Sequence, residues 1–270
     1  MTIWAVASLR GSPGATTLAM GLGAAWPATT GRPRVVVEAD PLGGVLAARY
    51  DELRADRTIA DAAVALRREF DVDRLLQVAR PVWGGLPVVP AQPSAAQTSA
   101  VLAHAAERMA QGLSSTTALD AVVDVGHLTA GSPALPLARR AVATLLVSRT
   151  RFEDVAALAA RVQELRAAGV DPWLVTVGSR PYAPDAVAAE AEIPVLAALP
   201  HDPSGAAVLA GEGARDGRLR RSLLWRMLCE LSSRLLEHAS PPVTAAAPAG
   251  DEARREPEPV ADQPEEVPAS

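Results

Sequence analysis

Residues Thr2 to Gly23, TIWAVASLRGSPGATTLAMGLG, combine an apolar, β-prone run, a loop with glycine and proline, and the start of a helix. The run up to Ser8 predicts a buried strand. The residues from Thr16 onward predict a helix that continues to Trp26. A helix that begins directly after a tight loop presents backbone N–H groups and the positive end of its dipole. The stretch therefore predicts a site for an anion such as phosphate.

The composition of the chain suits one α/β domain followed by a tail. The 270 residues are 49% hydrophobic but only 3% aromatic, so aliphatic side chains and alanine must fill the core. The formal net charge is -5, and residues 240–270 carry seven acids against two arginines, which equals this excess. The body is therefore near neutral, and we expect no specific binding of nucleic acid.

All 26 basic residues are arginines, and the sequence contains neither lysine nor asparagine. This excludes a Walker lysine, a Schiff-base lysine and a Tyr-x-x-x-Lys dyad. The single cysteine, Cys229, excludes an internal disulfide and predicts a buried thiol in a reducing compartment. No basic segment precedes an apolar run at the N-terminus, and no apolar run reaches about 20 residues. We therefore expect a cytoplasmic protein.

The loop after the first strand resembles the phosphate-binding loop of the MinD/ParA class of P-loop ATPases, whose deviant pattern is K-G-G-x-G-K-[ST]. The matching residues are Arg10, Gly11, Ser12, Pro13, Gly14, Ala15 and Thr16. Arg10 stands at the signature lysine that reaches a partner's nucleotide, and Ala15 at the lysine that binds phosphate. Pro13 removes one N–H from the loop. The resemblance implies ATP and Mg²⁺ as ligands, with nucleotide held by Gly11, Ser12, Gly14, Ala15, Thr16 and Thr17.

Two later strands end in acids that resemble further motifs of this class. Residues 34–39, RVVVEA, lead into Asp40-Pro41, as in D-x-D-P-x-x-G; residues 118–125 read ALDAVVDV, with Asp124 as the second-last residue. By resemblance, Asp40 would orient the attacking water, and Glu38 would contact the basic residues of the loop. Asp124 would be the Walker B aspartate that, with Thr16, holds Mg²⁺ through water. Alternatively, the acids at positions 38 and 40 cap the next helix, and we read His127 as a polar loop residue.

Strands and helices alternate along the remaining chain. We expect strands at 86–89, 141–148, 172–177 and 193–199 and helices at 94–111, 151–168 and 184–191, with two or three short helices in 45–80. Such alternation predicts a parallel sheet with helices on both faces, which is the three-layer P-loop NTPase fold. Thr16, Asp40 and Asp124 all follow predicted strands, where ligands of such sheets bind. The domain would span residues 1–239, and residues 240–270 form an acidic tail that we expect to be disordered.

The last helix, predicted over 217–238, carries a leucine-rich stripe with arginines largely on other faces. We favour a helix docked on the sheet over the alternative, an amphipathic helix for a membrane or partner, as MinD has at its C-terminus. The strand at 172–177 is followed by Gly178, where MinD-like proteins have an asparagine that recognises adenine. This side-chain recognition is therefore absent.

The degenerate loop, together with the run from Pro181 to Asp202, resembles the CpaE/TadZ-type branch, whose members help position pilus or secretion machinery. We expect a homodimer with weak or absent hydrolysis that serves a membrane-associated secretion, pilus or division machine, with peripheral membrane association. One alternative is an active ATPase in which Arg10 replaces the signature lysine. Another is a Rossmann-type oxidoreductase, although the loop lacks G-x-G-x-x-G.

Overall fold

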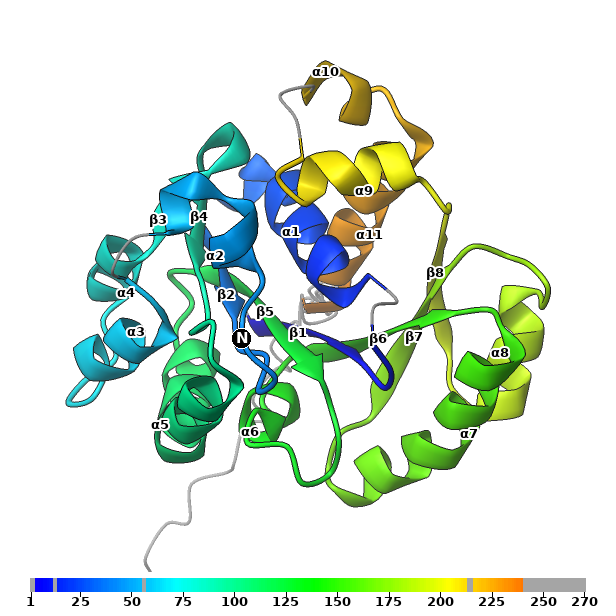
Figure 1. Ribbon diagram of the computed structural model, residues 1–270, viewed down its shortest axis with the longest axis horizontal. Coiled ribbons are helices and arrows are strands. Elements are labelled where there is room, and N and C mark those ends of the chain that lie inside the picture. Colours follow the sequence, from blue (N-terminus) through cyan, green and yellow to red (C-terminus); the bar gives the residue numbers. More distant parts are fainter. Residues whose placement is uncertain (1–2, 12–13, 55–56, 213–215, 240–270) are drawn as a thin grey trace, which may run out of the picture. The chain divides into compact units, whose positions relative to one another are not determined.

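A single eight-stranded sheet runs through the molecule in the order β3-β4-β2-β5-β1-β6-β7-β8 (Figure 1). The computed structural model describes residues 3–11, 14–54, 57–212 and 216–239. The predicted disordered tail, residues 240–270, lies outside these ranges, and the domain boundary before it stays a prediction. The strands are β1 (Ile3–Ser8), β2 (Arg34–Glu38), β3 (Arg80–Val82), β4 (Leu86–Val89), β5 (Asp120–His127), β6 (Ala143–Arg149), β7 (Pro172–Val177) and β8 (Val195–Leu199).

Every pair of neighbouring strands is parallel except β3 and β4, which are antiparallel. The predicted, mostly parallel sheet is therefore confirmed. β3 was not predicted, because Arg80-Pro81-Val82 is short and contains a proline. Pro81 donates no N–H to a ladder, and it lies opposite Pro87 of β4 at the sheet edge that β3 forms.

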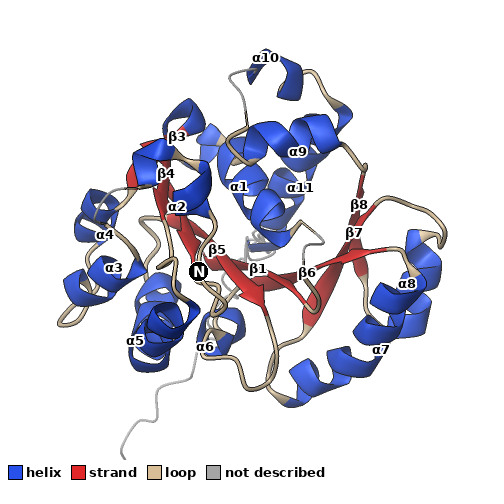
Figure 2. Cartoon of the chain, in the orientation of Figure 1, coloured by secondary structure: helices blue, strands red, loops and turns tan. Residues whose placement is uncertain are grey.

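Helices cover both faces of the sheet, as predicted (Figure 2). On one face, α1, α9 and α11 pack together; on the other, α3, α4, α5, α6, α7 and α8 form the second layer. The bounds are α1 (Ala15–Ala25), α2 (Leu46–Arg49), α3 (Ile59–Ala65), α4 (Val72–Val78), α5 (Ala95–Ser115), α6 (Leu135–Arg139), α7 (Phe152–Ala167), α8 (Pro184–Ala191), α9 (Pro203–Leu209), α10 (Asp216–Leu219) and α11 (Leu223–Ala239), with 3-10 turns η1 (Ala28–Thr30), η2 (Asp51–Leu53) and η3 (Trp83–Gly85).

The two layers enclose two separate hydrophobic cores. Alternate side chains of β1 enter opposite cores: Ile3 and Ala5 pack with α5 to α8, whereas Trp4 and Val6 pack with α1 and α11. All six residues of β1 are buried, which explains why the strand reads as a continuous apolar run rather than an alternating one. β1 therefore lies at the centre of the sheet with its carboxyl end leading into the loop.

Helix α1 lies unusually close to its neighbours because two of its residues are glycines. A Cβ added at Gly23 would lie 2.4 Å from Cγ2 of Val36 in the sheet. A Cβ added at Gly21 would lie 2.8 Å from Cδ1 of Leu228 in α11. The absence of side chains at these positions thus sets how closely α1 packs against β2 and α11.

The single helix predicted over 217–238 is wrong, since the structure divides it into α10 and α11. Ser222 starts the second helix, because its Oγ accepts a hydrogen bond from the Trp225 amide at 3.1 Å. At the break, the Arg220 guanidinium lies 5.4 Å and 5.1 Å from the ring centroids of Trp83 and Trp225. Cation–π contacts of this kind join the α10–α11 connection to η3.

The leucine stripe of α11 is used inside the domain. Leu224, Leu228, Leu231 and Leu235 are buried in the core that α1 shares. The preferred reading, a helix docked on the sheet, is therefore confirmed, and the stripe is not displayed for a membrane. None of the helices in the described ranges combines the length and the apolar character needed to cross a bilayer.

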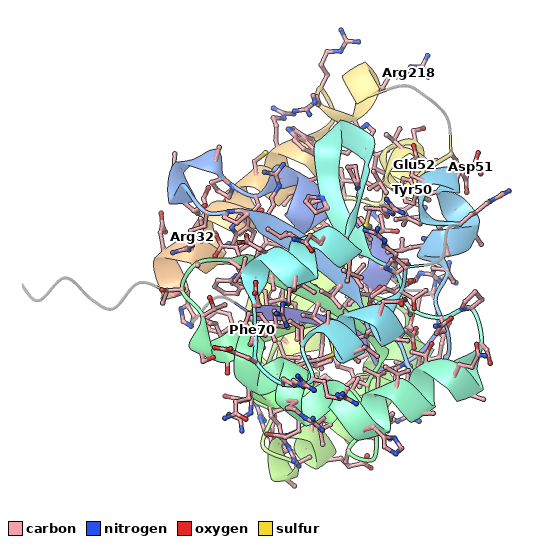
Figure 3. The ribbon with its side chains drawn as sticks, turned by 90° about the vertical axis from the view of Figure 1, so that its left-hand side faces the viewer. Arg32, Tyr50, Asp51, Glu52, Phe70 and Arg218 are labelled. Carbon is pink, nitrogen blue, oxygen red and sulfur yellow. The ribbon has the colours of Figure 1, made fainter. Side chains whose placement is uncertain are left out.

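Tyr50, at the end of α2, ties this part of the chain to α9 (Figure 3). Its Oη donates a hydrogen bond to the Leu209 carbonyl at 2.9 Å. Burial of the ring raises the pKa of Tyr50 to about 12, so the hydroxyl remains a donor at any physiological pH. The contact fixes the segment that follows the acidic strand end of β2.

Candidate functional site

The β1–α1 connection ends at Gly14, directly before helix α1. Gly14 adopts a left-handed conformation, with φ +106, and its carbonyl accepts the Leu18 amide at 2.8 Å. Helix α1 begins at Ala15, so Thr16 and Thr17 occupy its first turn, where unpaired N–H groups and the dipole favour an anion. The predicted loop residues Ser12 and Pro13 lie outside the described residues. Gly11 and Gly14, the described residues on either side of them, stay predicted nucleotide-binding residues.

Arg10, the counterpart of the signature lysine, lies toward α7. Its Nε is 3.9 Å from Oδ1 of Asp154, and 54% of its side chain is exposed. Arg161, also on α7, donates from Nη1 to the Leu9 carbonyl at 2.9 Å. Helix α7 therefore holds the start of the loop, and a long, half-exposed ion pair such as Arg10–Asp154 restrains Arg10 only weakly.

Asp124, the predicted Walker B residue, is buried without a cationic partner among the described residues. Its side chain is fully enclosed; Oδ1 accepts the Gly126 amide at 3.1 Å, and Oδ2 makes no hydrogen bond of regular geometry. Burial raises the pKa of Asp124 to about 7; the Thr16 hydroxyl opposes this rise, whereas Glu38 and Asp40 add to it. The structure thus brings Thr16 and Asp124 together, and the orphaned Oδ2 is suited to a metal-bound water.

The predicted role of Glu38, contact with basic residues of the loop, is wrong. Its Oε1 accepts the amides of Val45 at 2.7 Å and Leu46 at 3.1 Å, and its Oε2 accepts that of Ala91 at 3.0 Å. Burial raises its pKa, and these N–H groups oppose the rise. Glu38 therefore caps the start of α2, as the alternative reading held, because backbone donors left unpaired by the turn lie nearer than any arginine.

Asp40 is fixed by the two strands that end beside it. Its Oδ1 accepts the Leu42 amide at 2.9 Å, and the His127 backbone amide and imidazole both act to lower a pKa that burial raises. Gly126, with φ +59, leaves the space that the carboxyl group occupies, since a Cβ there would lie 1.9 Å from Cγ of Asp40. Asp40 and Asp124 therefore share one edge of the sheet, as predicted.

Gly126 and His127 are site residues whose role the sequence reading missed. Their position shortly after Asp124 in the sequence could have indicated a role in the site. Their contact with Asp40, however, depends on how β2 and β5 pair. Glu38 aligns with Asp124 in that pair, and the Ala39 amide donates to the Asp124 carbonyl at 2.7 Å. The ladder thus continues past Glu38 and delivers Asp40 onto Gly126.

A cavity of about 230 Å³ opens beside the loop and the first turn of α1. Its lining residues include Gly14 and Thr17, Arg149 at the end of β6, and His201 and Asp202. A second cavity of about 710 Å³ continues past Arg149 to Gly178 and Ser179, after β7. Gly178 has φ +83 and no side chain, so the space next to it is lined by backbone and by the neighbouring residues.

Within the described ranges, no group of three or more His, Cys, Asp or Glu side chains is placed to hold a metal ion alone. A P-loop Mg²⁺ needs no such group, because a hydroxyl, phosphate oxygens and waters supply most of its ligands. Thr16 and the orphaned Asp124 carboxyl fit that role. Phosphate fits the Gly14 turn and the helix N-terminus, but Ala15 leaves the turn without the cation that usually accompanies it.

No family model and no curated protein matches the sequence. Solved structures do match. A ParA family ATPase from Chlorobium tepidum TLS is 12% identical with a TM-score of 0.69, covering 86% of this chain and 97% of its own. The septum site-determining protein MinD from Pyrococcus horikoshii OT3, complexed with Mg-ADP, is 17% identical with a TM-score of 0.67, covering 87% and 95%. A chain of the MinC:MinD cell division protein complex from Aquifex aeolicus is 13% identical with a TM-score of 0.65, covering 89% of this chain and 98% of its own.

Likeness at these identities shows the fold. The chain has the fold of the P-loop NTPases, with a mostly parallel eight-stranded sheet between two helical layers. Within that class, its fold is that of the ParA and MinD ATPases, as the resemblance in the loop implied. In this fold β5 lies between β1 and β2, whereas in a dinucleotide-binding sheet the strand after the glycine-loop helix pairs directly with the first strand. The strand order thus argues against the oxidoreductase alternative.

Proposed function

We propose that this chain is a MinD/ParA-like P-loop protein that binds nucleotide with Mg²⁺ weakly and hydrolyses it slowly or not at all. One observation carries the proposal: Ala15, the first residue of α1, provides no cation. Its surroundings, namely the left-handed Gly14, Thr16 and Asp124, are otherwise suited to phosphate and metal. Loss of one preorganised donor to a transition state typically slows a reaction by about 10²- to 10³-fold.

The nucleotide would be held by N–H groups of the loop and of the first turn of α1, from Gly11 to Thr17. Thr16 and Asp124 would hold Mg²⁺, which supplies charge compensation at the phosphates when bound. Asp40 lies beside them and would position a water in any residual reaction. In this chain its carboxyl also ties β2 to β5, so its substitution affects the shape of the site as well.

Calorimetric titration of the full chain with Mg-ATP and Mg-ADP, followed by a phosphate-release assay, tests the proposal. We expect measurable but weak binding, and phosphate release that does not differ between the unaltered chain and Asp40→Ala. Ala15→Lys should tighten Mg-ATP binding, because it restores the missing cation. No binding of either nucleotide, under conditions where the chain is folded, would contradict nucleotide binding altogether.

The second candidate is an active ATPase of the same fold in which Arg10 replaces the signature lysine. It is favoured by the half-exposed guanidinium of Arg10, whose contact with Asp154 is long enough to exchange for a partner's phosphate. An arginine supplied across an interface can contribute about 10³- to 10⁵-fold in rate. Turnover that is abolished by both Arg10→Gln and Asp40→Ala would favour this candidate.

In the cell, we propose a cytoplasmic homodimer that acts as a localisation or scaffold factor for a membrane-associated pilus, secretion or division machine. The MinC:MinD complex of similar fold shows that such a fold can assemble with a protein partner in another organism. Light scattering with and without Mg-ATP tests the homodimer. Fractionation of cells tests association with the inner face of the membrane, and genes for pilus or secretion components beside this one would support the machine.

A further inference from the structure

Arg10 is the only basic residue of the loop from Arg10 to Thr16. The charge of a bound phosphate would therefore need to be balanced from elsewhere if Arg10 does not contact it. Ala15 is apolar, and Arg10 extends toward Asp154 on α7. The carboxyls of Asp124 and Asp40 add negative potential nearby. Mg²⁺ would offset part of the charge of a di- or triphosphate in this loop, and the remaining charge needs a cation from another element of the fold.

The position of Arg149 follows from the pairing of the two central strands. β6 is the parallel neighbour of β1, and Val147 aligns with Ser8, the last residue of β1 (Figure 1). Arg149 therefore lies two residues beyond the level at which β1 ends, at the same carboxyl edge of the sheet. It is half-buried, and it lines the same cavity as Gly14 and Thr17.

Arg149 also marks the junction between the two cavities. The smaller cavity is lined by Gly14 and Thr17 at the N-terminus of α1, and the larger cavity is lined by Gly178 and Ser179. Both are lined by Arg149 together with Val177 and His201. A nucleoside phosphate that placed its phosphates at the helix N-terminus and its larger group beside Gly178 would pass Arg149 on the way.

We infer that Arg149 is the phosphate-binding cation of this site and supplies from β6 the charge that is missing at Ala15. This inference rests on the proposed nucleotide binding and names the residue that makes it work. A guanidinium suits the task because it stays charged and offers several donors in one plane to phosphate oxygens. Arg149 keeps contacts of its own within the chain, and the ligand adds to them.

Arg151 provides a matched control on the same connection. It lies two residues farther along, is exposed, and lines the larger cavity without lining the smaller one. Arg149→Gln and Arg151→Gln therefore remove the same charge from the same region. Only Arg149→Gln removes it from the smaller cavity, which Gly14 and Thr17 also line.

The test is calorimetric titration of the unaltered chain, Arg149→Gln, Arg149→Lys and Arg151→Gln with Mg-ADP and with adenosine. We expect Arg149→Gln to weaken Mg-ADP binding by about 10- to 100-fold, with adenosine binding unchanged, because one charge-assisted contact is lost. Arg149→Lys should lose less, and Arg151→Gln, which alters only the larger cavity, should weaken Mg-ADP binding much less than Arg149→Gln. Equal Mg-ADP affinity in Arg149→Gln would overturn the inference while leaving nucleotide binding intact. Absence of binding by the unaltered chain would overturn both.

A second measurement needs no variant and so does not depend on how Arg149→Gln folds. The unaltered chain is treated with phenylglyoxal, which modifies arginines, with and without Mg-ADP, and its peptides are analysed by mass spectrometry. Mg-ADP should slow modification of Arg149 more than that of Arg151. Equal modification rates at Arg149, at an Mg-ADP concentration that calorimetry shows to saturate the site, would contradict the inference.

Discussion

Asp124 is the residue on which the chemistry of the site depends most. It is enclosed on all sides, its Oδ2 has no regular hydrogen bond, and the nearby acids Glu38 and Asp40 disfavour its charge. A buried carboxyl in such surroundings is costly when ionised, unless a cation arrives. Asp124 therefore lowers the stability of the chain without a metal ion, and it is a candidate ligand of the metal when nucleotide and metal are bound.

The first prediction concerns Asp124→Asn. The pKa of Asp124 is about 7 in the folded chain, above its value in an unfolded chain, so the folded state binds more protons between about pH 4 and pH 7. Stability contributed by this group is therefore lost as pH rises through that window. Without metal, Asp124→Asn should be more stable than the unaltered chain at pH 8, by about 1–4 kcal/mol, and similar at pH 4. Urea unfolding at both pH values measures this, and parallel pH dependence in the two chains would contradict it.

The second prediction concerns Gly126. An alanine there would place its Cβ 1.9 Å from Cγ of Asp40, at a backbone φ of +59 that side chains disfavour. We expect Gly126→Ala to destabilise the fold by about 2–4 kcal/mol and to displace Asp40. Gly131→Ala is the control, because an added Cβ there meets nothing within 4 Å. Equal unfolding midpoints for the two variants would show that the close approach to Asp40 is not as described.

At the scale of residues, types and spacings predicted part of the site. Gly14, Thr16, Asp40 and Asp124 do meet at one edge of the sheet, because each follows a strand whose parallel direction could be inferred. The contacts of Glu38 could not be inferred, since its partner Ala91 lies 53 residues away in sequence. The same holds for Gly126 against Asp40, whose approach is set by strand register rather than by any local pattern.

Helix α11 shows most clearly, at the scale of elements, how a sequence pattern leaves two readings open. Its leucine stripe is equally compatible with a membrane surface and with a core. The structure decides, because α11 packs on α1 and β8, and Leu228 enters the space left by Gly21. The break before Leu223 was hidden from the periodicity, which continues through both helices. Ser222 and the ring contacts of Arg220 create it.

The third prediction tests this use of α11. Leu228 is 1% exposed, whereas Leu223 on the same helix is 51% exposed. Leu228→Ala should destabilise the domain by about 2–5 kcal/mol, since it leaves a cavity against α1. Leu223→Ala should change stability by less than about 0.5 kcal/mol. Thermal or urea unfolding measures both, and a small effect of Leu228→Ala would mean that α11 contributes little to the core.

The other elements were predicted well where both faces of a strand or one face of a helix are apolar. Strands 86–89 and 172–177 and helix 184–191 have the predicted bounds. Ser94 is the N-cap of α5, with Oγ accepting the Gln97 amide at 3.5 Å. The elements that escaped, β3 and α6, are short, and neighbouring elements rather than their own sequences hold them in place.

At the scale of the whole molecule, the sheet separates the site from a second polar cluster. Loop, acids and cavities lie at the carboxyl edge, and the ion pair Arg32–Asp120 lies at the opposite edge, where β2 and β5 begin (Figure 3). Arg32 contacts Asp120 through Nε at 3.2 Å and Nη2 at 2.8 Å, and the acid is 2% exposed. Stability and binding should therefore respond separately to substitutions at the two edges.

The fourth prediction makes this separation measurable. Arg32→Gln should lower the free energy of unfolding by about 1–3 kcal/mol, because it leaves a buried carboxylate with a weaker partner. It should leave nucleotide affinity unchanged. Arg54→Gln is the control, since the Arg54–Asp51 pair is exposed on both sides and should contribute less than about 1 kcal/mol. A loss of affinity in Arg32→Gln, with the protein still folded, would mean that the two edges are coupled.

The glycines of α1 have one more consequence. Because Gly23 rests against Val36 and Gly21 against Leu228, the helix cannot slide or rotate without driving its backbone into one of these side chains. Its first turn is a stationary reference, and any rearrangement on arrival of a ligand must occur in the connections that surround it. Amide hydrogens of α1 should consequently exchange at the same slow rate in the free and the occupied protein, while those of residues 8–11, 14 and 39–45 respond.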